Sequence, residues 1–418
     1  MNSKSFSPPT QGRSAVPDLR GLSLIGWGIL LLGFVLPFSN MFVSSHRVPD
    51  ADFVGFYSLG RILNEHPAQS LYDYELLKQV CTQVHPISRV YGPLPYPPFV
   101  GLFFRPFALL PYWVAYLLWV ALTLALYASG LTIILSRFFP QKVPGRSLLL
   151  CLAFSYCPFI VDTAANGQLA AIGFFALALA MREDDLGHGL QSGLALSLCL
   201  YKPTLLVLLL PMLLVTRRLK ALGGFAAGAA VLALATSAFE GFGIWPFFFN
   251  TIFSYGKAAT GGHSASIRNL SKFVDLTSFS SLAYGGRSWP GLAIILMCAC
   301  CALFCLLWLG WKSPRMGRPF NSVLWATTVT WTLLLNVYVP VYDSILVVLS
   351  VIVTAGALSY LPDKPIHRWF ALIWVFILAG SWFSVGLAAA TGVQLLTLLF
   401  VALGILQLTA LRKLARQA

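Results

Sequence analysis

Residues 112–135 read YWVAYLLWVALTLALYASGLTIIL, a run of 24 residues in which no side chain carries a charge. A helix needs about 20 consecutive apolar residues to cross the hydrocarbon core of a bilayer, so this run predicts a transmembrane helix. The whole chain has the same character, since 58% of its 418 residues are hydrophobic and 10% are charged. A soluble domain carries roughly 25% charged residues because its surface must be solvated. The composition therefore predicts an integral membrane protein and excludes a soluble one.

Apolar runs of this kind recur along the chain and predict an all-α polytopic membrane protein with about 12 transmembrane helices. The expected spans lie near residues 21–43, 112–135, 147–163, 168–181, 188–201, 203–215, 221–239, 290–310, 320–338, 344–360, 369–389 and 391–410. The fourth, fifth and sixth of these runs are short. Short helices are tolerated where they border a polar cavity rather than lipid.

The positions of the basic residues predict the orientation of the chain. If the N-terminus is cytoplasmic, alternation places 18 of the 28 Lys and Arg residues on the cytoplasmic side, although the outer loops are longer. This distribution follows the positive-inside rule. We therefore expect cytoplasmic tails at 1–20 and 411–418 and a single transmembrane domain at 21–410. Its long outer loops fall near 44–111 and 240–289.

Neither the net charge nor the cysteines indicate a further class of ligand. The net charge of +14 comes from short clusters between apolar runs, which does not favour nucleic acid as a partner. Seven of the eight cysteines lie in apolar runs, and none has the spacing of a zinc site. The sequence also lacks a Walker-type loop and a histidine pair at metal spacing. We expect no metal and no cofactor, and we interpret Arg182-Glu183-Asp184-Asp185 as a solvated cytoplasmic connector.

The first outer loop holds the acids Asp50 and Asp52, directly after the first expected span. A carboxylate at the outer mouth of a helix bundle can act as general base toward a hydroxyl nucleophile. The alternative is a solvated loop acid or an N-cap for the helix that starts near Phe53. That helix, with Phe56–Leu63 at helical spacing, is predicted to lie in the membrane interface. The prolines of Tyr91–Pro98 then forbid a regular helix, and a re-entrant hairpin follows.

Two outer turns carry polar residues close to the bilayer. The turn Asp162–Gln168 contains Asn166 and Gln168, which could bind sugar hydroxyls, or it is a plain polar hairpin in which Gly167 supplies a positive φ. Lys202 lies between two short spans, next to the helix-breaking Pro203. It could hold a lipid phosphate, or its side chain could reach the interface and contact only solvent.

Two later segments complete the set of candidates. Arg268 and Asn269 in the second long outer loop could bind phosphate and sugar together, or the loop could be attracted to anionic headgroups. The turn Tyr342-Asp343 places an acid at the mouth of the following span. Asp343 is either a second carboxylate of the site or a helix N-cap.

Five stretches, taken in order, resemble the polytopic glycosyltransferases of the C-superfamily, family eighty-seven, the polyprenol-phosphate-mannose-dependent α-mannosyltransferase type. The stretches are Asp52-Phe-Val-Gly-Phe-Tyr57, Tyr91-Gly-Pro-Leu-Pro-Tyr-Pro-Pro98, Asn166-Gly-Gln168, Tyr201-Lys-Pro203 and Tyr342-Asp343. The resemblance spans about residues 20–360, and the C-terminal spans match only in hydropathy.

The resemblance implies a GT-C-like enzyme of the inner membrane that transfers a sugar, with inversion, outside the cytoplasm. The donor would be a polyprenyl-phosphate sugar and the acceptor a lipid or a glycan. Asp52 would be the general base, and Lys202 with Arg268 would bind the donor phosphate. The sugar and acceptor would contact the remaining candidates, which are Asp50, Tyr57, Asn166, Gln168, Asn269, Tyr342 and Asp343.

Two other functions fit parts of the sequence. A secondary transporter would have charged residues near the middle of spans and matching broken helices in two halves, whereas no repeat relates the halves of this chain. A ligase-like enzyme that transfers lipid-linked glycans would keep the fold and change the donor. Mannose comes from the family alone, and a pentose would suit the same residues.

Overall fold

The computed structural model describes residues 52–85, 94–139, 146–260, 270–285, 289–313, 316–336 and 338–417, with the single residues 28, 31 and 35. The expected span at 21–43 falls almost entirely outside the described residues. The same holds for three candidate site residues, Asp50, Arg268 and Asn269.

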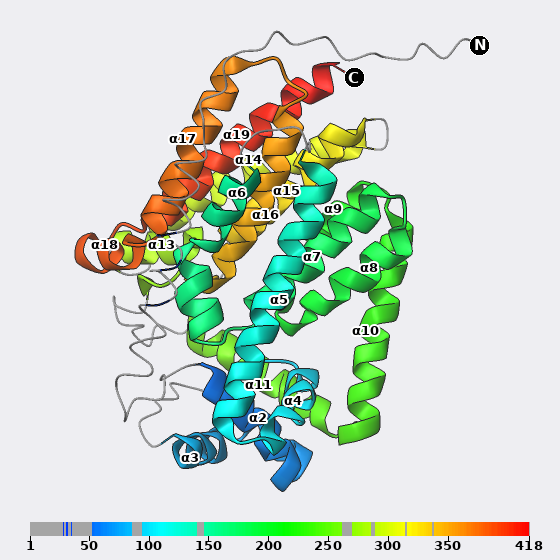
Figure 1. Cartoon of the computed structure of the whole chain (residues 1–418), viewed down its shortest axis with the longest axis vertical. Helices are drawn as coiled ribbons and strands as arrows, with labels where there is room; N and C mark the ends of the chain where they lie inside the picture. Colours follow the sequence, from blue (N-terminus) through cyan, green and yellow to red (C-terminus); the bar gives the residue numbers. More distant parts are fainter. Residues whose placement is uncertain are drawn as a thin grey trace.

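The described chain is helical from end to end (Figure 1). The α-helices are α2 (Phe53–Glu65), α3 (Tyr74–Val84), α4 (Pro98–Phe104), α5 (Tyr112–Phe138), α6 (Arg146–Phe154), α7 (Ala170–Asp185), α8 (Gly189–Ser197), α9 (Leu209–Val215), α10 (Leu219–Glu240), α11 (Ile244–Thr260), α13 (Leu276–Ala283), α14 (Trp289–Lys312), α15 (Arg318–Leu334), α16 (Leu346–Leu358), α17 (Lys364–Ser381), α18 (Ser384–Thr391) and α19 (Leu395–Gln417). Short 3-10 or π turns are η1 (Ala68–Tyr72), η2 (Phe107–Leu109), η3 (Pro158–Ala165), η4 (Leu198–Tyr201), η5 (Pro203–Leu206) and η7 (Val341–Ile345). Within these residues the β pairing is one isolated bridge, Phe273 to Pro340. The all-α polytopic membrane fold is confirmed.

Fewer helices reach full membrane-spanning length than the 12 apolar runs that the sequence suggested. In the described residues five helices are long and apolar enough, or up to seven if each of two bent pairs counts as one span. One bent pair joins η3 to α7 at 112°, and the other joins α17 to α18 at 76°. The helical segments Gly189–Tyr201 and Pro203–Val215 are too short. Their positions match the expected runs, but Pro203 interrupts the helix between them, as a proline without an N–H donor does.

Close contacts between backbones hold the short helix α8 against the long helix α10. A Cβ added at Gly193 would clash with the carbonyl oxygen of Ala221, and one added at Gly224 would clash with the carbonyl oxygen of Leu190. Small residues allow two helix backbones to approach this closely. In a membrane, where the hydrophobic effect does not drive helices together, such close packing stabilises their association. Because α8 and α10 pack so closely, the short segments on either side of Lys202 have a rigid support.

Helices α2, α3 and α4 gather at one end of the molecule, and the C-terminal end of α19 lies at the other (Figure 1). The predicted helix after Asp52 is confirmed as α2, but its place differs from the prediction. Residues Phe53 to Gly60 are all buried, so α2 packs inside the protein and not with one face on the lipid surface. The ring of Phe53 contacts Phe104 of α4 and Trp119 of α5, with centroids 6.0 and 6.4 Å apart. This aromatic packing buries the apolar face of α2, which the sequence pattern identified as apolar without showing what covers it.

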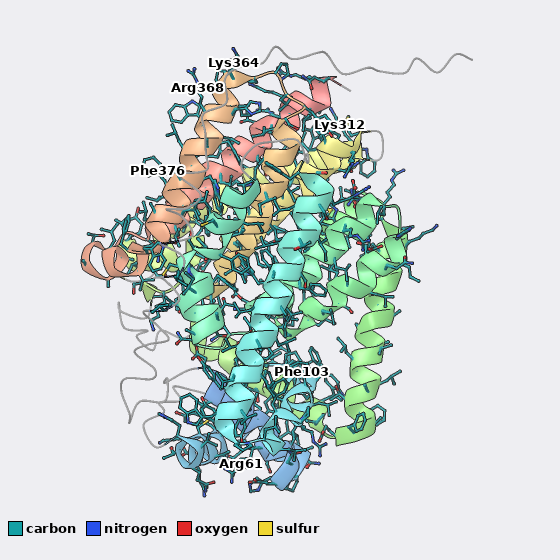
Figure 2. The ribbon with its side chains drawn as sticks, in the orientation of Figure 1. Arg61, Phe103, Lys312, Lys364, Arg368 and Phe376 are labelled. Carbon is teal, nitrogen blue, oxygen red and sulfur yellow. The ribbon has the colours of Figure 1, made fainter. Side chains whose placement is uncertain are left out.

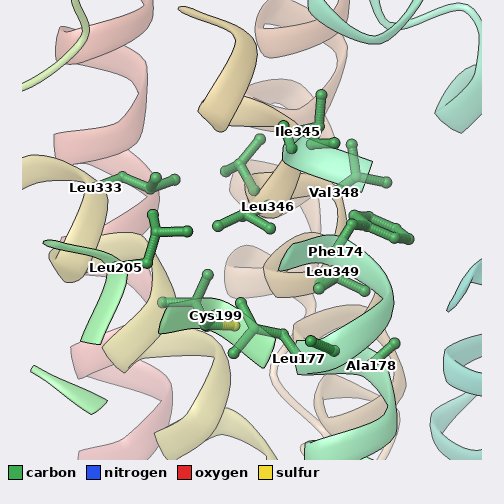
Figure 3. Packing of buried hydrophobic residues seen from close by; sticks show 14 of the residues in the cluster. Phe174, Leu177, Ala178, Cys199, Leu205, Leu333, Ile345, Leu346, Val348 and Leu349 are labelled. Atoms are coloured by element: carbon green, nitrogen blue, oxygen red, sulfur yellow. The ribbon is translucent and has the colours of Figure 1, made fainter. Parts of the chain in front are cut away.

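The core centres on η7 and α16, since 89% of the residues in Val341–Leu358 are buried. Figure 3 shows side chains from several elements that meet there, with Leu205 of η5 beside Leu333 of α15, and Cys199 of η4 beside Leu177 of α7. Ile345 at the end of η7 belongs to the same cluster. The breaks at η4, η5 and η7 are therefore packed within protein, where irregular backbone is tolerated at membrane depth.

Candidate active site

Asp52 stands one residue before α2, but its side chain does not cap that helix. Its Oδ2 atom accepts a hydrogen bond from Gln168 Nε2 at 2.5 Å. The backbone adds a second link, since Phe53 N donates to Asn166 O at 3.1 Å. The N-cap interpretation of Asp52 is therefore wrong for the side chain. The two segments that the sequence singled out separately, around Asp52 and around Gln168, lie against each other.

The turn that carries Asn166 and Gln168 is fixed by two aromatic residues of α5. Tyr116 Oη donates to Ala165 O at 2.6 Å, and Trp119 Nε1 donates to Gly167 O at 2.8 Å. Gly167 has φ of +73°, and a Cβ there would lie 2.7 Å from the Cβ of Phe53. Only glycine suits a positive φ together with so close an approach. The expectation of a positive φ at Gly167 is confirmed, and it coexists with the contact from Gln168 to Asp52.

Gln168 offers one further polar atom at this position. The residue is buried, and its Oε1 has no hydrogen-bond partner among the described residues. A buried acceptor without a partner is costly, so such atoms concentrate where a ligand or water completes the bonding. The Gln168 amide therefore orients Asp52 through its nitrogen and leaves its oxygen available.

Lys202 and Asp343 form an ion pair and hydrogen bond across the core. Both are buried, with Lys202 9% and Asp343 1% exposed. Lys202 follows η4, where the chain turns before Pro203, and Asp343 lies in η7, so each comes from a break between helices. The Lys202 ammonium also lies 5.0 Å from the ring centroid of Tyr342 and 5.5 Å from that of Tyr338. The cation thus has one carboxylate and two aromatic faces around it.

Tyr342 precedes Asp343 in η7, and its ring faces the Lys202 ammonium. Its phenol is within electrostatic range of Asp52, Tyr96 and Asp343. Tyr96 comes from the proline-rich stretch before α4, and its carbonyl accepts a hydrogen bond from Tyr72 Oη at 2.9 Å. In the sequence this stretch stands out by its prolines and as a family motif, but nothing in it predicted Tyr96 as part of the site.

Two charged residues that the sequence analysis did not select also reach this region. Asp162 of η3 is within electrostatic range of Asp52 and of Lys272, and it is hydrogen-bonded to the side chain of Asn166. Lys272 is exposed, and its carbonyl accepts from Val341 N at 2.8 Å. Both were visible in the sequence, Asp162 in the quoted turn and Lys272 in the second outer loop, but nothing there indicated that the two segments meet.

The segment that carries Lys272 is held to the site by Asp275. Its carboxylate accepts from Ser278 N at 2.8 Å and from Val339 N at 3.1 Å, so it caps α13 and binds the loop before η7. Burial raises the pKa of Asp275, although these hydrogen bonds act in the opposite direction. Thr397 Oγ1 also donates to Val274 O at 2.9 Å. This end of the second outer loop is therefore a fixed wall beside Tyr342.

The structure brings most of the described candidates together and separates one. The grouped candidates are Asp52, Asn166, Gln168, Lys202, Tyr342 and Asp343. Tyr57 is buried in α2, and its hydroxyl donates to Leu110 O at 2.9 Å. Tyr57 therefore joins α2 to the chain before α5. In the described part of the chain no group of three or more His, Cys, Asp or Glu residues could hold a metal ion.

In this polytopic helical protein, acids and a lysine meet at breaks between helices. These features define a membrane protein with a polar site embedded among its helices. The sequence itself then identifies the family. The model of glycosyltransferase family 87 matches residues 94–337, so the chain belongs to glycosyltransferase family 87. The predicted family resemblance is confirmed. No curated protein and no solved structure matches the chain. Lys202 and Gln168 lie inside the matched range, and Asp52 lies outside it.

Proposed function

We propose that this membrane glycosyltransferase moves a sugar, with mannose as the expected sugar, from a polyprenyl-phosphate donor to a lipid or glycan acceptor. The observation that carries the proposal is the position of Asp52, whose carboxylate caps no helix and is hydrogen-bonded to the Gln168 amide, within electrostatic range of Tyr342. A carboxylate oriented by a neighbouring amide at the mouth of a helix bundle is suited to accept a proton from a hydroxyl.

In the proposed reaction an acceptor oxygen attacks the anomeric carbon of the donor sugar from the face opposite the phosphate. The bond from the anomeric carbon to the phosphate oxygen breaks, and polyprenyl phosphate leaves with the electron pair. Asp52 takes the proton of the acceptor hydroxyl. The configuration of the anomeric carbon inverts because attack and departure occur on opposite faces.

The negative charge that builds on the leaving phosphate needs nearby cations. Lys202 is the first candidate. Because Asp343 already pairs with Lys202, the ammonium would have to share its hydrogens between that carboxylate and the phosphate. Lys272 is the second, since it is exposed at the rim and has no ion pair among the described residues. Arg268 remains a proposed phosphate ligand from the family resemblance, and these cations would make a metal ion unnecessary.

Sugar and acceptor hydroxyls would bind to the polar groups around Asp52. Asn166, Gln168, Tyr342 and Asp343 are grouped there, which supports this role. For three further residues, Asp50, Tyr57 and Asn269, the proposed contact with sugar or acceptor rests on the family resemblance alone. For Tyr57 the hydrogen bond to Leu110 favours an indirect role through the position of α2.

We place the site on the extracytoplasmic face of the inner membrane, with both termini in the cytoplasm. Lys312, Lys364 and Arg368, three residues expected on the cytoplasmic side, lie at the end of the molecule opposite Arg61, which is expected outside (Figure 2). This separation supports the alternating topology that the positive-inside rule predicts. A lipid-linked donor could then reach the site from the bilayer.

The test is a transfer assay on the purified full-length protein in detergent with EDTA present. Radiolabelled polyprenyl-phosphate-mannose, a pentose analogue and a lipid-pyrophosphate-linked glycan are offered separately, with a membrane lipid extract as acceptor. Transfer from a polyprenyl-phosphate monosaccharide supports the proposal. Transfer only from the pyrophosphate-linked glycan would establish the ligase-like alternative, and uptake of a solute into proteoliposomes without any transfer would establish transport.

A further inference from the structure

A polar cavity of about 420 Å³ lies at the end of the molecule opposite α2 and α3 (Figure 1). Its wall comes from α7, α15 and the turn between α9 and α10, and it contains Asp184, Asp185, Arg218 and Arg318. A cavity of this size is in the range that holds small organic ligands. Because Asp52 and Gln168 do not line it, the cavity is separate from the candidate active site.

The charged side chains in this wall form a fixed network. Arg218 pairs with Asp184 and donates through Nη2 to Asn321 Oδ1 at 3.0 Å. Trp325 Nε1 donates to the same Asp184 oxygen as Arg218, at 2.8 Å. The prediction that Asp184 is part of a solvated connector is therefore wrong, because this acid is bound by groups from distant parts of the chain.

The two acids of the wall are shared among three arginines, of which Arg218 and Arg318 line the cavity. Asp185 binds Arg318 Nε at 2.8 Å and also pairs with Arg137, which lies outside the wall. Both oxygens of Asp185 are used, whereas Asp184 binds only through Oδ2 among the described residues. Arg318 therefore has only a share of the Asp185 carboxylate, and its side chain is 45% exposed. Asp184 keeps one carboxylate oxygen without a partner among the described residues. Such a wall suits a ligand that carries both an anion and a cation.

Aromatic and basic residues near the cavity mark the level of the lipid headgroups. Lys312 lies 4.0 Å from the ring centroid of Trp308, and Arg217 lies 4.8 Å from that of Trp311. Both tryptophans are exposed, and exposed Trp beside Lys or Arg is typical of the boundary between membrane and water. Arg217 has φ of 58°, and in this turn Arg217 covers Trp311 while the next residue, Arg218, enters the cavity wall.

We propose that this cavity binds the headgroup of a membrane phospholipid in which a phosphodiester is joined to a primary amine, as in phosphatidylethanolamine. The phosphate would bind Arg318 and Arg218, because guanidinium groups match phosphate oxygens with paired hydrogen bonds. The ammonium would bind Asp184 Oδ1. The depth of the cavity at the headgroup level favours a lipid over a dissolved phosphate compound as the source of this ligand.

The proposal is tested by binding to the delipidated full-length protein in detergent, measured by native mass spectrometry and by the shift in unfolding temperature. The probes are dioleoyl-phosphatidylethanolamine, dioleoylglycerol, which lacks the headgroup, and glycerophosphoethanolamine, which lacks the chains. The variants are Arg318→Ala and Ser322→Phe, the second of which fills part of the cavity. The matched controls are Arg182→Ala, with similar exposure and one ion pair, and Ser136→Phe on an exposed face of α5.

We expect phosphatidylethanolamine to bind and to raise the unfolding temperature. Its affinity should be about tenfold weaker in Arg318→Ala, as the loss of one charged hydrogen bond predicts, and also weaker in Ser322→Phe, because the ring occupies the space of the headgroup. The two control variants should bind as the wild type does. Equal stabilisation by dioleoylglycerol, or equal binding in the cavity and control variants, would overturn the proposal. Binding of glycerophosphoethanolamine without binding of the lipid would also overturn it, because the ligand would then come from solution.

Discussion

Removal of the Asp343 charge should destabilise the protein far more than removal of a surface charge. Asp343→Asn leaves the Lys202 ammonium buried without its carboxylate, and Lys202 is only 9% exposed. Loss of one partner of a buried ion pair costs about 3–5 kcal/mol. Glu65→Gln is the matched control, since it breaks an exposed i,i+4 pair with Arg61. Such an exposed pair contributes about 0.3–0.5 kcal/mol.

The double variant Lys202→Met with Asp343→Leu separates lost charge pairing from lost packing. It leaves no buried charge, so its cost should be clearly below the sum of the costs of the two single changes. The free energy of unfolding would be measured in mixed micelles by SDS titration, with tryptophan fluorescence as the signal. Additive costs, or an Asp343→Asn variant as mild as Glu65→Gln, would refute the conclusion that this pair is coupled and buried.

Three further predictions follow from the described contacts. Gln168→Leu removes the amide that orients the proposed base and should lower kcat about 100-fold while the protein stays folded, because small misplacements of a catalytic group are costly. An unchanged kcat would mean that other groups hold the base. Gly193→Ala should cost about 1–3 kcal/mol of stability by forcing α8 away from α10. Gly223→Ala is the control, because Gly223 has open space around it, and it should be neutral in the same unfolding assay. Equal effects of the two changes would contradict the close packing of α8 and α10. Lys78→Cys should react with a membrane-impermeant maleimide in intact cells, whereas Lys220→Cys should react only after the cells are opened, and the reverse pattern would invert the proposed topology.

The positions of the helices could be predicted from the sequence because membrane depth imposes a length and an apolar composition on each span. The run at 112–135 became α5, and the expected break at Lys202-Pro203 became the boundary of η4 and η5. Proline removes a backbone donor wherever it falls, so this break follows from local chemistry. Gly167 is similar, since a polar turn with glycine between two spans predicts the positive φ that the structure has.

The contacts inside the site could not be predicted in the same way. Gln168 and Asp52 are 116 residues apart, and Lys202 and Asp343 are 141 residues apart. A single sequence marks each as a polar residue near an apolar run, but it does not determine which runs pack together. The sequence suggests Lys202 as a cation for the donor phosphate, whereas its pairing with Asp343 becomes visible only in the folded chain.

The same limit explains why α2 and the Asp184 turn were placed in solvent or at the interface. An amphipathic pattern records that one face is apolar, but not whether lipid or protein covers it. In α2 the cover is protein, from α4 and α5. At Asp184 the hydrogen-bond donors are Arg218 and Trp325, in parts of the chain far from the turn.

The most direct test of the central claim is a comparison of Asp52→Asn with Asp73→Asn in the transfer assay. Asp73 is an exposed acid in the same outer region, and it caps α3, a role that asparagine also fills. Both variants would first be shown to unfold as the wild type does. We predict that Asp52→Asn loses sugar transfer while still binding polyprenyl phosphate, and that Asp73→Asn transfers sugar at the wild-type rate. Wild-type transfer by Asp52→Asn would contradict the assignment of Asp52 as the base.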